Sequence, residues 1–171
     1  VIENRLEMFD ELLVERFLGC YEDIREFTVS MIGSGNRMLL MPAEIKLKVS
    51  KEVRVITTSD KDDHLTQAQP VLQAELKQAL SAFAGSALRV AGVRDYARCD
   101  IILAGDNLYA IEINGQPMVP DKWFGSGAWG AGMDESQYLN AILLAGLSRC
   151  SRKSSRLSIP AQMTQALPEP I

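Results

Sequence analysis

Two β-rich runs joined by a Gly-Asp-Asn turn, within residues 96–114, constrain the fold more than any other part of the sequence. Alternate side chains of a strand point to opposite faces, so Arg98 and Asp100 share one face of the first run. By the same rule Glu112 and Asn114 share one face of the second run. A three-residue connection would put Asp100 opposite Glu112 and Arg98 opposite Asn114. The sequence therefore predicts a hairpin with two carboxylates, an amide and a guanidinium on one face.

The second face of this hairpin is expected to be apolar, formed by Ala97, Cys99, Ile101, Leu103, Tyr109, Ile111 and Ile113. On the polar face, two carboxylates directly opposite each other repel and would destabilise the sheet. A hard cation between them removes that repulsion, and Mg²⁺ accepts carboxylate and amide oxygens as ligands. Arg98 cannot bind a cation, but it can hold an anion such as a transferring phosphoryl group.

The R-x-D strand and the E-x-N strand together resemble the metal-binding hairpin of ATP-grasp carboxylate-amine ligases, most closely the D-alanine–D-alanine ligase group. The resemblance implies ATP as cofactor and two Mg²⁺ ions, with Mn²⁺ as a substitute. It implies Asp100, Glu112 and Asn114 as metal ligands, with Glu112 shared between the ions. It also implies Arg98 as the catalytic residue that stabilises the phosphate and the oxyanion during acyl transfer.

Residues 12–30 also resemble a segment of the same ligases. In that segment, a strand that ends in a glutamate and hydrophobic residues is followed by a strand with the sequence E-F-T-V. By that match Glu15 would accept from the adenine amino group, and Glu26 would accept from the ribose hydroxyls. The residues implied to line the adenine are Arg16, Phe17 and Leu18. Glu22 competes with Glu26 for the ribose, and a phosphate-binding lysine is left open among Lys46, Lys48 and Lys51.

The loop predicted over residues 115–132 departs from the pattern of the dipeptide ligases. In that group a T-x-P-G-[ML]-T segment and then a Ser follow the E-x-N, and the Ser holds the carboxylate of the second substrate. Here Gly115 replaces the first Thr, and Ser126 is the candidate for the substrate contact. Trp123, Phe124 and Trp129 indicate either a bulkier acceptor site or rings that pack the loop on the last helix.

The bulk properties fit one domain of a protein that binds small molecules. The chain has 171 residues, 47% of them hydrophobic, and a net charge of −4, which gives no general attraction for nucleic acid. No stretch of about 18 apolar residues and no signal peptide is visible, so we expect a cytoplasmic protein without membrane contact. The three cysteines are far apart and are expected to be reduced thiols.

The order of the predicted elements indicates an α+β fold with a mainly antiparallel sheet and flanking helices, as in the C-terminal portion of the ATP-grasp fold. We expect residues 1–150 to form the C-terminal part of the nucleotide- and metal-binding domain, and residues 151–171 to form a flexible tail. Since Val1 opens inside a helical pattern, we also expect a missing N-terminal part of the enzyme.

The strands are expected at residues 12–18, 25–32, 37–41 and 44–49. The last of these is either a separate strand or a continuation of the previous one past Pro42. A loop is expected at 50–69 and a helix at 3–10. A second helix is expected to start near Pro70, with an apolar stripe of Leu72, Leu76, Leu80 and Phe83. A third is expected at 135–150, with a buried side of Leu139, Ile142, Leu143 and Leu147.

The resemblance implies an ADP-forming ligase that joins a carboxylate, through an acyl phosphate, to an amine, as in D-alanine–D-alanine ligases. The substrates would be amino acids or peptides, and a homodimer is compatible with this function. One alternative is an ATP-grasp ligase for L-amino acids or natural-product peptides, which the altered loop favours. An alternative of another class is a non-catalytic ATP-grasp domain that binds nucleotide for regulation.

Overall fold

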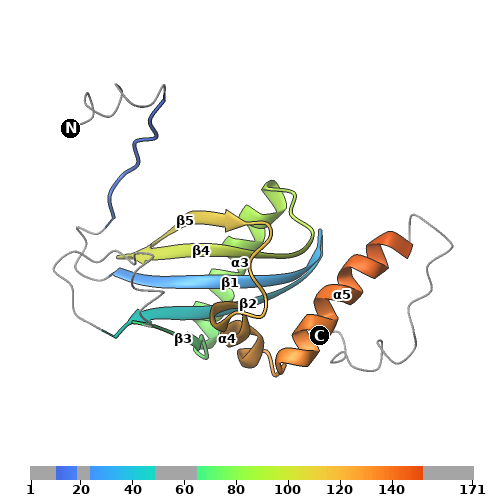
Figure 1. The fold of residues 1–171 in the computed structure, drawn as a ribbon. Coiled ribbons are helices and arrows are strands. Elements are labelled where there is room, and N and C mark those ends of the chain that lie inside the picture. Colours follow the sequence, from blue (N-terminus) through green and yellow to red (C-terminus); the bar gives the residue numbers. More distant parts are fainter. Residues whose placement is uncertain (1–10, 19–23, 49–64, 152–171) are drawn as a thin grey trace.

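The computed structural model describes residues 11–18, 24–48 and 65–151. Its centre is a five-stranded antiparallel sheet in the order β3-β2-β1-β4-β5 (Figure 1). The strands are β1 (Ile24–Ser34), β2 (Arg37–Leu47), β3 (Thr66–Pro70), β4 (Asp95–Ala104) and β5 (Asn107–Asn114). Neighbouring strands in sequence mostly neighbour each other in space, as hairpin connections require.

Three helices cover the sheet unequally (Figure 1). They are α3 (Ala74–Val90), α4 (Lys122–Gly130) and α5 (Glu135–Ser151). α3 packs behind the sheet, whereas α4 and the start of α5 pack on the other face at one end. This second face therefore remains open over the middle of β4 and β5. The expected α+β class with an antiparallel sheet is confirmed.

The core between α3 and the sheet follows directly from strand alternation. Phe27, Val29 and Met31 of β1 point toward α3 and are at most 2% exposed. From β4, Cys99 and Ile101 join them at 0% and 1% exposure. The intervening residues of these two strands face the other side of the sheet, where Thr28, Arg98 and Asp100 lie.

The glycines of α4 allow this helix to lie directly on the sheet. A Cβ atom at Gly127 would overlap the carbonyl oxygen of Met41 in β2. A Cβ at Gly130 would meet the ring of Pro70 in β3. The Gly-rich stretch that the sequence indicated as a loop is therefore a helix, because its glycines serve close packing rather than turns. The prediction of a loop throughout residues 115–132 was wrong on this point.

Two other predicted boundaries change in the sheet. β2 runs without a break through Pro42, so the strands expected at 37–41 and 44–49 are one strand, the alternative that the sequence left open. β3 lies inside the segment expected to be a loop, and Pro70 ends this strand instead of starting a helix. A proline is tolerated there because β3 is an edge strand.

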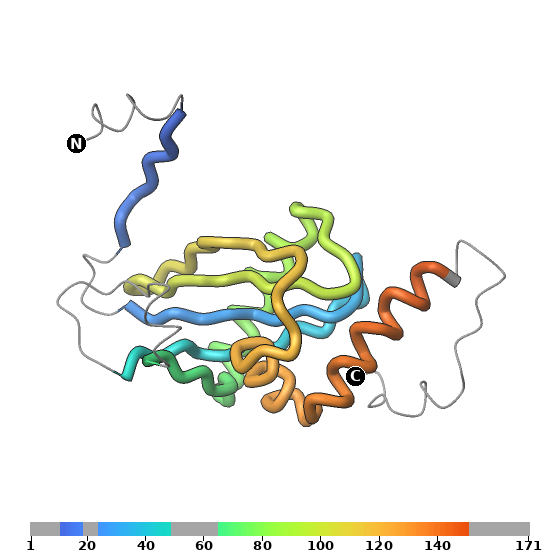
Figure 2. The backbone as a smooth tube through the Cα atoms, in the orientation of Figure 1, coloured from blue at the N-terminus to red at the C-terminus, as the bar shows by residue number. Residues whose placement is uncertain are grey.

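Residues 11–18 have no regular secondary structure, so the strand expected at 12–18 was wrong. Figure 2 shows this segment running away from the sheet. Leu13 and Val14 are 84% and 72% exposed. No strand among the described residues pairs with the segment, and an isolated strand is not stable in water.

The two long helices appear where the sequence placed them, and the stripe predicted for α3 is confirmed at Leu76, Leu80 and Phe83. In α3, Leu80 is fully buried, but Leu72 lies before the helix and is 80% exposed. In α5 the most buried residues are Tyr138, Ala141 and Leu144, whereas Leu143, expected to be buried, is 56% exposed. In α5 the buried face is rotated toward these three residues, with Leu139 and Ile142 at its margin. The last turn of the helix is held to β4 by the ion pair of Arg149 with Asp95 at 2.6 Å.

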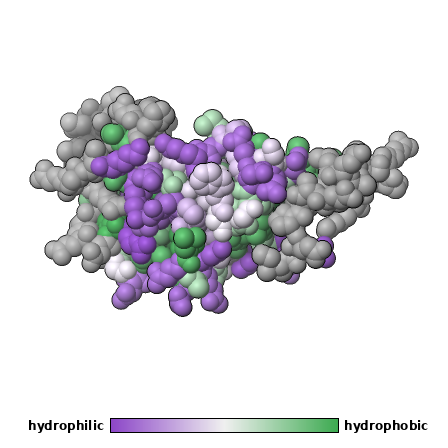
Figure 3. Space-filling model, turned by 90° about the horizontal axis from the view of Figure 1, so that it is seen from below, coloured by the Kyte–Doolittle hydropathy of each residue, from purple (hydrophilic) through white to green (hydrophobic). Residues whose placement is uncertain are grey.

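The expected helix at 3–10 and the tail at 152–171 lie outside the described residues, as do Glu22, Lys51 and His64. Figure 3, a view from the β3 edge, shows a surface of hydrophilic areas with smaller hydrophobic patches between them. No helix in the described ranges is long and apolar enough to cross a membrane.

Candidate functional site

Five side chains on the open face of the sheet form a polar ladder, which we define as Thr28, Arg98, Asp100, Glu112 and Asn114. β1 supplies Thr28, which pairs with Asp100 in the register of β1 and β4. The register of β4 and β5 places Asp100 opposite Glu112 and Arg98 opposite Asn114. The sequence predicted these two cross-strand pairs. Thr28 was missed, although its alternation with Glu26 in the E-F-T-V segment was a usable signal.

The cross-strand pairs agree with the prediction, but the hairpin loop is shorter than predicted and a bulge restores the pairing. The hairpin loop has two residues, Gly105 and Asp106, since Ala104 already pairs with Asn107. Gly105 has a φ of +58°, which suits the first position of a two-residue hairpin loop. A register shift then occurs between Asp100 and Ile101 of β4, opposite the residues around Ile111.

This bulge exchanges the two faces of β5 between its ends. Glu112 faces the ladder because Ile111 is the extra residue, and Ile111 is 53% exposed instead of lying on the apolar face. Leu108 packs in the core with Leu103, and Tyr109 lies on the other face near Ile102. The placement of Tyr109 and Ile111 on the apolar face was therefore wrong.

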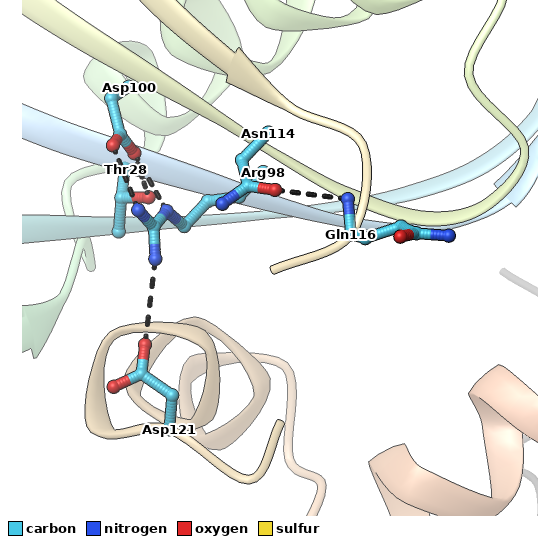
Figure 4. A network of polar contacts seen from close by, with 6 residues as sticks. All are labelled: Thr28, Arg98, Asp100, Asn114, Gln116 and Asp121. Carbon is cyan, nitrogen blue, oxygen red and sulfur yellow. Dashed lines mark hydrogen bonds and ion pairs between the residues drawn. The ribbon is translucent and has the colours of Figure 1, made fainter. Parts of the chain in front are cut away.

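Asp100 is the most constrained carboxylate of the ladder (Figure 4). The hydroxyl of Thr28 donates to its Oδ1 at 2.7 Å. The Nε of Arg98 donates to the same oxygen at 3.0 Å, and Nη2 donates to Oδ2 at 3.1 Å. Asp100 and Arg98 thus form a forked ion pair with side chains 22% and 12% exposed. A cation that binds Asp100 would compete with Arg98 for the same oxygens.

The other two oxygen donors are more accessible. Glu112 lies exposed on the edge strand β5. The Oδ1 of Asn114 accepts from the backbone N–H of Gln116 at 3.0 Å, which fixes the amide at the point where the chain leaves β5. Two carboxylates and one amide oxygen suit a hard cation such as Mg²⁺. Among the described residues, no group of three or more His, Cys, Asp and Glu side chains gathers as a metal site. A metal here would therefore need the Asn114 amide, water or phosphate oxygens as further ligands.

Arg98 contacts a second carboxylate that the sequence reasoning did not select. Its Nη1 lies 3.6 Å from Oδ2 of Asp121, the residue at the start of α4 (Figure 4). The guanidinium carbon is 5.1 Å from the centre of the Trp123 ring, a cation–π contact. Asp121 directly precedes a helix, which is a signal for an N-terminal cap, but α4 itself was not recognised.

The three aromatic rings of this region have different surroundings. Trp123 is 7% exposed beside Arg98, and Phe124 is fully buried with its ring centre 5.5 Å from that of Tyr138 in α5. Trp129 is 74% exposed. Phe124 therefore packs α4 on the last helix, which agrees with the interpretation that the rings have a packing role. Trp123 is the ring that lies next to the ladder. Ser126 is 8% exposed in the second turn of α4, and Gly115 is exposed just after β5.

The residues expected to bind the nucleotide base are only partly brought to the ladder face. Leu18 is 7% exposed and packs with Ile24 and Ala104 at the end of the sheet opposite α4. Glu26 lies on the ladder face of β1, between Ile45 of β2 and Ile102 of β4. In the segment before Leu18, the side chains of Glu15, Arg16 and Phe17 are exposed.

The candidate lysines lie elsewhere. Nζ of Lys46 is 3.7 Å from Oε2 of Glu44, and Glu44 pairs with Phe27 on the α3 face. Burial tends to raise the pKa of Glu44, but its hydrogen bond from Arg25 at 2.9 Å and the nearby cations lower it overall. This cluster belongs to the opposite side of the sheet from the ladder, and Lys48 is exposed at the end of β2.

The fold and the ladder agree with the comparisons with known proteins. The sequence profile of the family described as "D-ala D-ala ligase C-terminus" matches residues 1–143. The chain therefore belongs to this family, and its fold is the C-terminal portion of the ATP-grasp domain. No relative among curated protein sequences matches the chain.

Solved structures of ligases share this fold. The D-alanine–D-alanine ligase from Bacillus anthracis has a TM-score of 0.60 and 21% identity, over 90% of this chain and 48% of that one. The same enzyme complexed with ATP has a TM-score of 0.56 and 22% identity, over 78% of this chain and 43% of that one. The VanG D-Ala:D-Ser ligase from Enterococcus faecalis has a TM-score of 0.53 and 15% identity, over 71% of this chain and 36% of that one. The chain thus spans less than half the length of these ligases.

Proposed function

We propose that this chain supplies the metal- and phosphate-binding part of an ADP-forming ligase that joins a carboxylate to an amine. The observation that carries the proposal is the register of the polar ladder. Arg98 and Asp100 on β4 face Asn114 and Glu112 on β5, on a side of the sheet that the helices leave open. Family membership supports the same class of reaction.

The reaction would proceed in two bond-making steps. An oxygen of the donor carboxylate attacks the γ-phosphorus of ATP, which forms an acyl phosphate as ADP leaves. The nitrogen of the acceptor amine then attacks the acyl carbon and loses a proton, and the carbon–oxygen bond to phosphate breaks. No protein nucleophile is required, so the ladder needs only to position groups and to stabilise charge.

Each ladder residue has a role that follows from its contacts. Asp100, Glu112 and Asn114 would hold Mg²⁺, two ions sharing Glu112, and the metal would neutralise the charge of the phosphates. Thr28 holds Asp100 in place through the 2.7 Å hydrogen bond. Arg98 has N–H groups beyond those that Asp100 accepts, and it would use them to stabilise the oxyanion of the acyl transfer.

We propose that Leu18 and Glu26 mark the nucleotide end of the same face. Leu18 closes an apolar cluster with Ile24 and Ala104, and Glu26 lies between that cluster and Thr28 along β1. An apolar slot beside an acceptor suits adenine and ribose. Glu15, Arg16 and Phe17 would contribute only with this segment closed over the sheet. Ser126 and Gly115 stay candidates for the substrate contact near α4.

The test is ADP release by the complete enzyme with Mg²⁺-ATP and pooled D- and L-amino acids, beside the variant Glu112→Gln. Since Glu112 is exposed on an edge strand, the variant should fold normally and lose turnover by about 10²-fold or more. Amino-acid-dependent release that survives fully in Glu112→Gln would contradict the metal assignment. ATP binding without any release would favour the regulatory alternative.

A further inference from the structure

We infer that Trp123 is a positioning residue that keeps the guanidinium plane of Arg98 in place when Asp100 holds a metal ion. The inference rests on the proposed function and concerns the oxyanion-stabilising group of that same site. Trp123 lies in the first turn of α4 and is 7% exposed. The guanidinium carbon of Arg98 lies over its ring, 5.1 Å from the ring centre. An aromatic ring therefore covers one face of the guanidinium.

The other contacts of Arg98 act on the edges of the guanidinium. The fork with Asp100 aligns Nε and Nη2. Nη1 is 3.6 Å from the carboxylate of Asp121, a distance longer than a hydrogen bond, so this contact attracts the group without aligning it (Figure 4). Of these three contacts, the one with Trp123 is the contact that opposes tilting of the guanidinium out of its plane.

The contacts also differ in their response to a bound cation. Both oxygens of Asp100 accept from Arg98, and the same oxygens would serve as ligands of Mg²⁺. Sharing them would weaken the fork. The indole ring is not shared in this way, because Mg²⁺ takes oxygen ligands and keeps its waters, whereas a guanidinium binds readily to an aromatic face. Trp123 is thus the contact that Arg98 retains in the metal-loaded site.

Trp123 is itself held firmly enough for this role. α4 lies so close to β2 that a Cβ at Gly127 would overlap the carbonyl oxygen of Met41. The next residue after Trp123, Phe124, is fully buried and packs against α5. The ring over Arg98 therefore belongs to a helix that is fixed both to the sheet and to the last helix. This arrangement orients the guanidinium before charge develops on the substrate.

The first experiment measures kcat and KM for amino-acid-dependent phosphate release by the full-length protein with Mg²⁺-ATP. Trp123→Leu keeps an apolar side chain and removes the aromatic face, so we expect kcat to fall by about tenfold, the scale of a desolvated cation–π contact, with the KM for ATP unchanged. Trp123→Phe keeps an aromatic face and should retain most of kcat. The control Trp129→Leu makes the same change at a 74% exposed position of α4 and should leave kcat unchanged.

A second comparison tests whether Trp123 acts through Arg98. In an Arg98→Ala background, Trp123→Leu should cause no further loss of kcat, because the group that Trp123 positions is absent. A merely structural role of the ring would lower kcat by the same factor in both backgrounds.

A third measurement detects the contact without turnover. The full-length protein is labelled with 5-fluorotryptophan, and the ¹⁹F resonance that disappears in Trp123→Phe belongs to Trp123. This resonance should shift in Arg98→Ala, because the cation over the ring is removed. We expect the same shift with Mg²⁺ and a non-hydrolysable ATP analogue present, since the contact persists when Asp100 holds the metal.

Three results would overturn the inference. One is a Trp123→Leu variant with wild-type kcat, and another is an equal loss of kcat in the Arg98→Ala background. The third is a Trp123 resonance that no longer responds to Arg98→Ala once Mg²⁺ and the ATP analogue are added. A wild-type protein that releases no phosphate with any amino acid would contradict the proposed function, whereas the resonance would still test the contact.

Discussion

At the scale of single residues, Arg98 joins β4 to the start of α4 within the candidate site. It forms the forked pair with Asp100, faces Asp121 and stacks on Trp123. This arrangement needs the planar fork of a guanidinium, which a lysine ammonium cannot reproduce. The charge of Arg98 alone would therefore not preserve its proposed role.

The variant Arg98→Lys should lower kcat by about 10²-fold or more, since it keeps one positive charge and loses the aligned donors. Its far-ultraviolet circular dichroism should stay that of the wild-type protein, because β4 is held in the sheet by its pairing with β1 and β5. A folded Arg98→Lys enzyme with wild-type kcat would contradict the catalytic assignment of this residue.

Cys99 gives a prediction for the pH dependence of stability. Burial, reinforced by the charge of Asp100, raises the pKa of its thiol from 9.0 to about 11. Between these values the unfolded chain has lost a proton that the folded chain retains. The free energy of unfolding should therefore fall as pH rises from 9 toward 11. Urea unfolding at several pH values should show a shallower fall for Cys99→Ala than for the wild-type protein, and parallel curves would refute this origin.

At the scale of elements, the packing of α4 on β2 brings two side chains next to Arg98. Asp121 and Trp123 sit at the start of this helix, and Gly127 sets its distance from the sheet. Glycine within a helix costs stability relative to alanine, so its presence here reflects contact with the Met41 carbonyl.

Gly127→Ala should destabilise the protein by about 1–3 kcal/mol, because the added methyl group must push α4 away from backbone atoms of β2. The matched control is Gly125→Ala in the same helix, whose added Cβ would meet only the Tyr138 ring at an ordinary 3.8 Å. The control should be neutral or more stable by up to about 1 kcal/mol. Chemical denaturation measures both, and equal effects of the two substitutions would contradict this account of α4.

The comparison of the sequence with the structure shows what local patterns can predict at this scale. Alternation and the turn signal were enough to pair Asp100 with Glu112, since the bulge at Ile111 happens to compensate for the shorter loop. The bulge itself has no signal in a single sequence. α4 was missed because Gly127 and Gly130 were taken as turn residues, when they are required by contacts with β2 and β3. Such contacts depend on the tertiary fold.

At the scale of the whole molecule, the two faces of the sheet differ in what covers them. One face of the sheet is closed by α3, and the other presents the ladder beside the cluster of Leu18, Ile24 and Ala104. The solved ligases with this fold are more than twice as long as the part that this chain matches. The proposed ligase activity is therefore to be tested on the full-length protein.

The most direct test of the central claim follows an oxygen atom. The complete enzyme is given Mg²⁺-ATP and pooled amino acids with both carboxylate oxygens labelled with ¹⁸O, and the released phosphate is analysed by mass spectrometry. An acyl phosphate route predicts one ¹⁸O atom in each phosphate released, because the donor oxygen leaves with the phosphoryl group. Amino-acid-dependent release of unlabelled phosphate would show direct hydrolysis of ATP and would contradict the ligase mechanism.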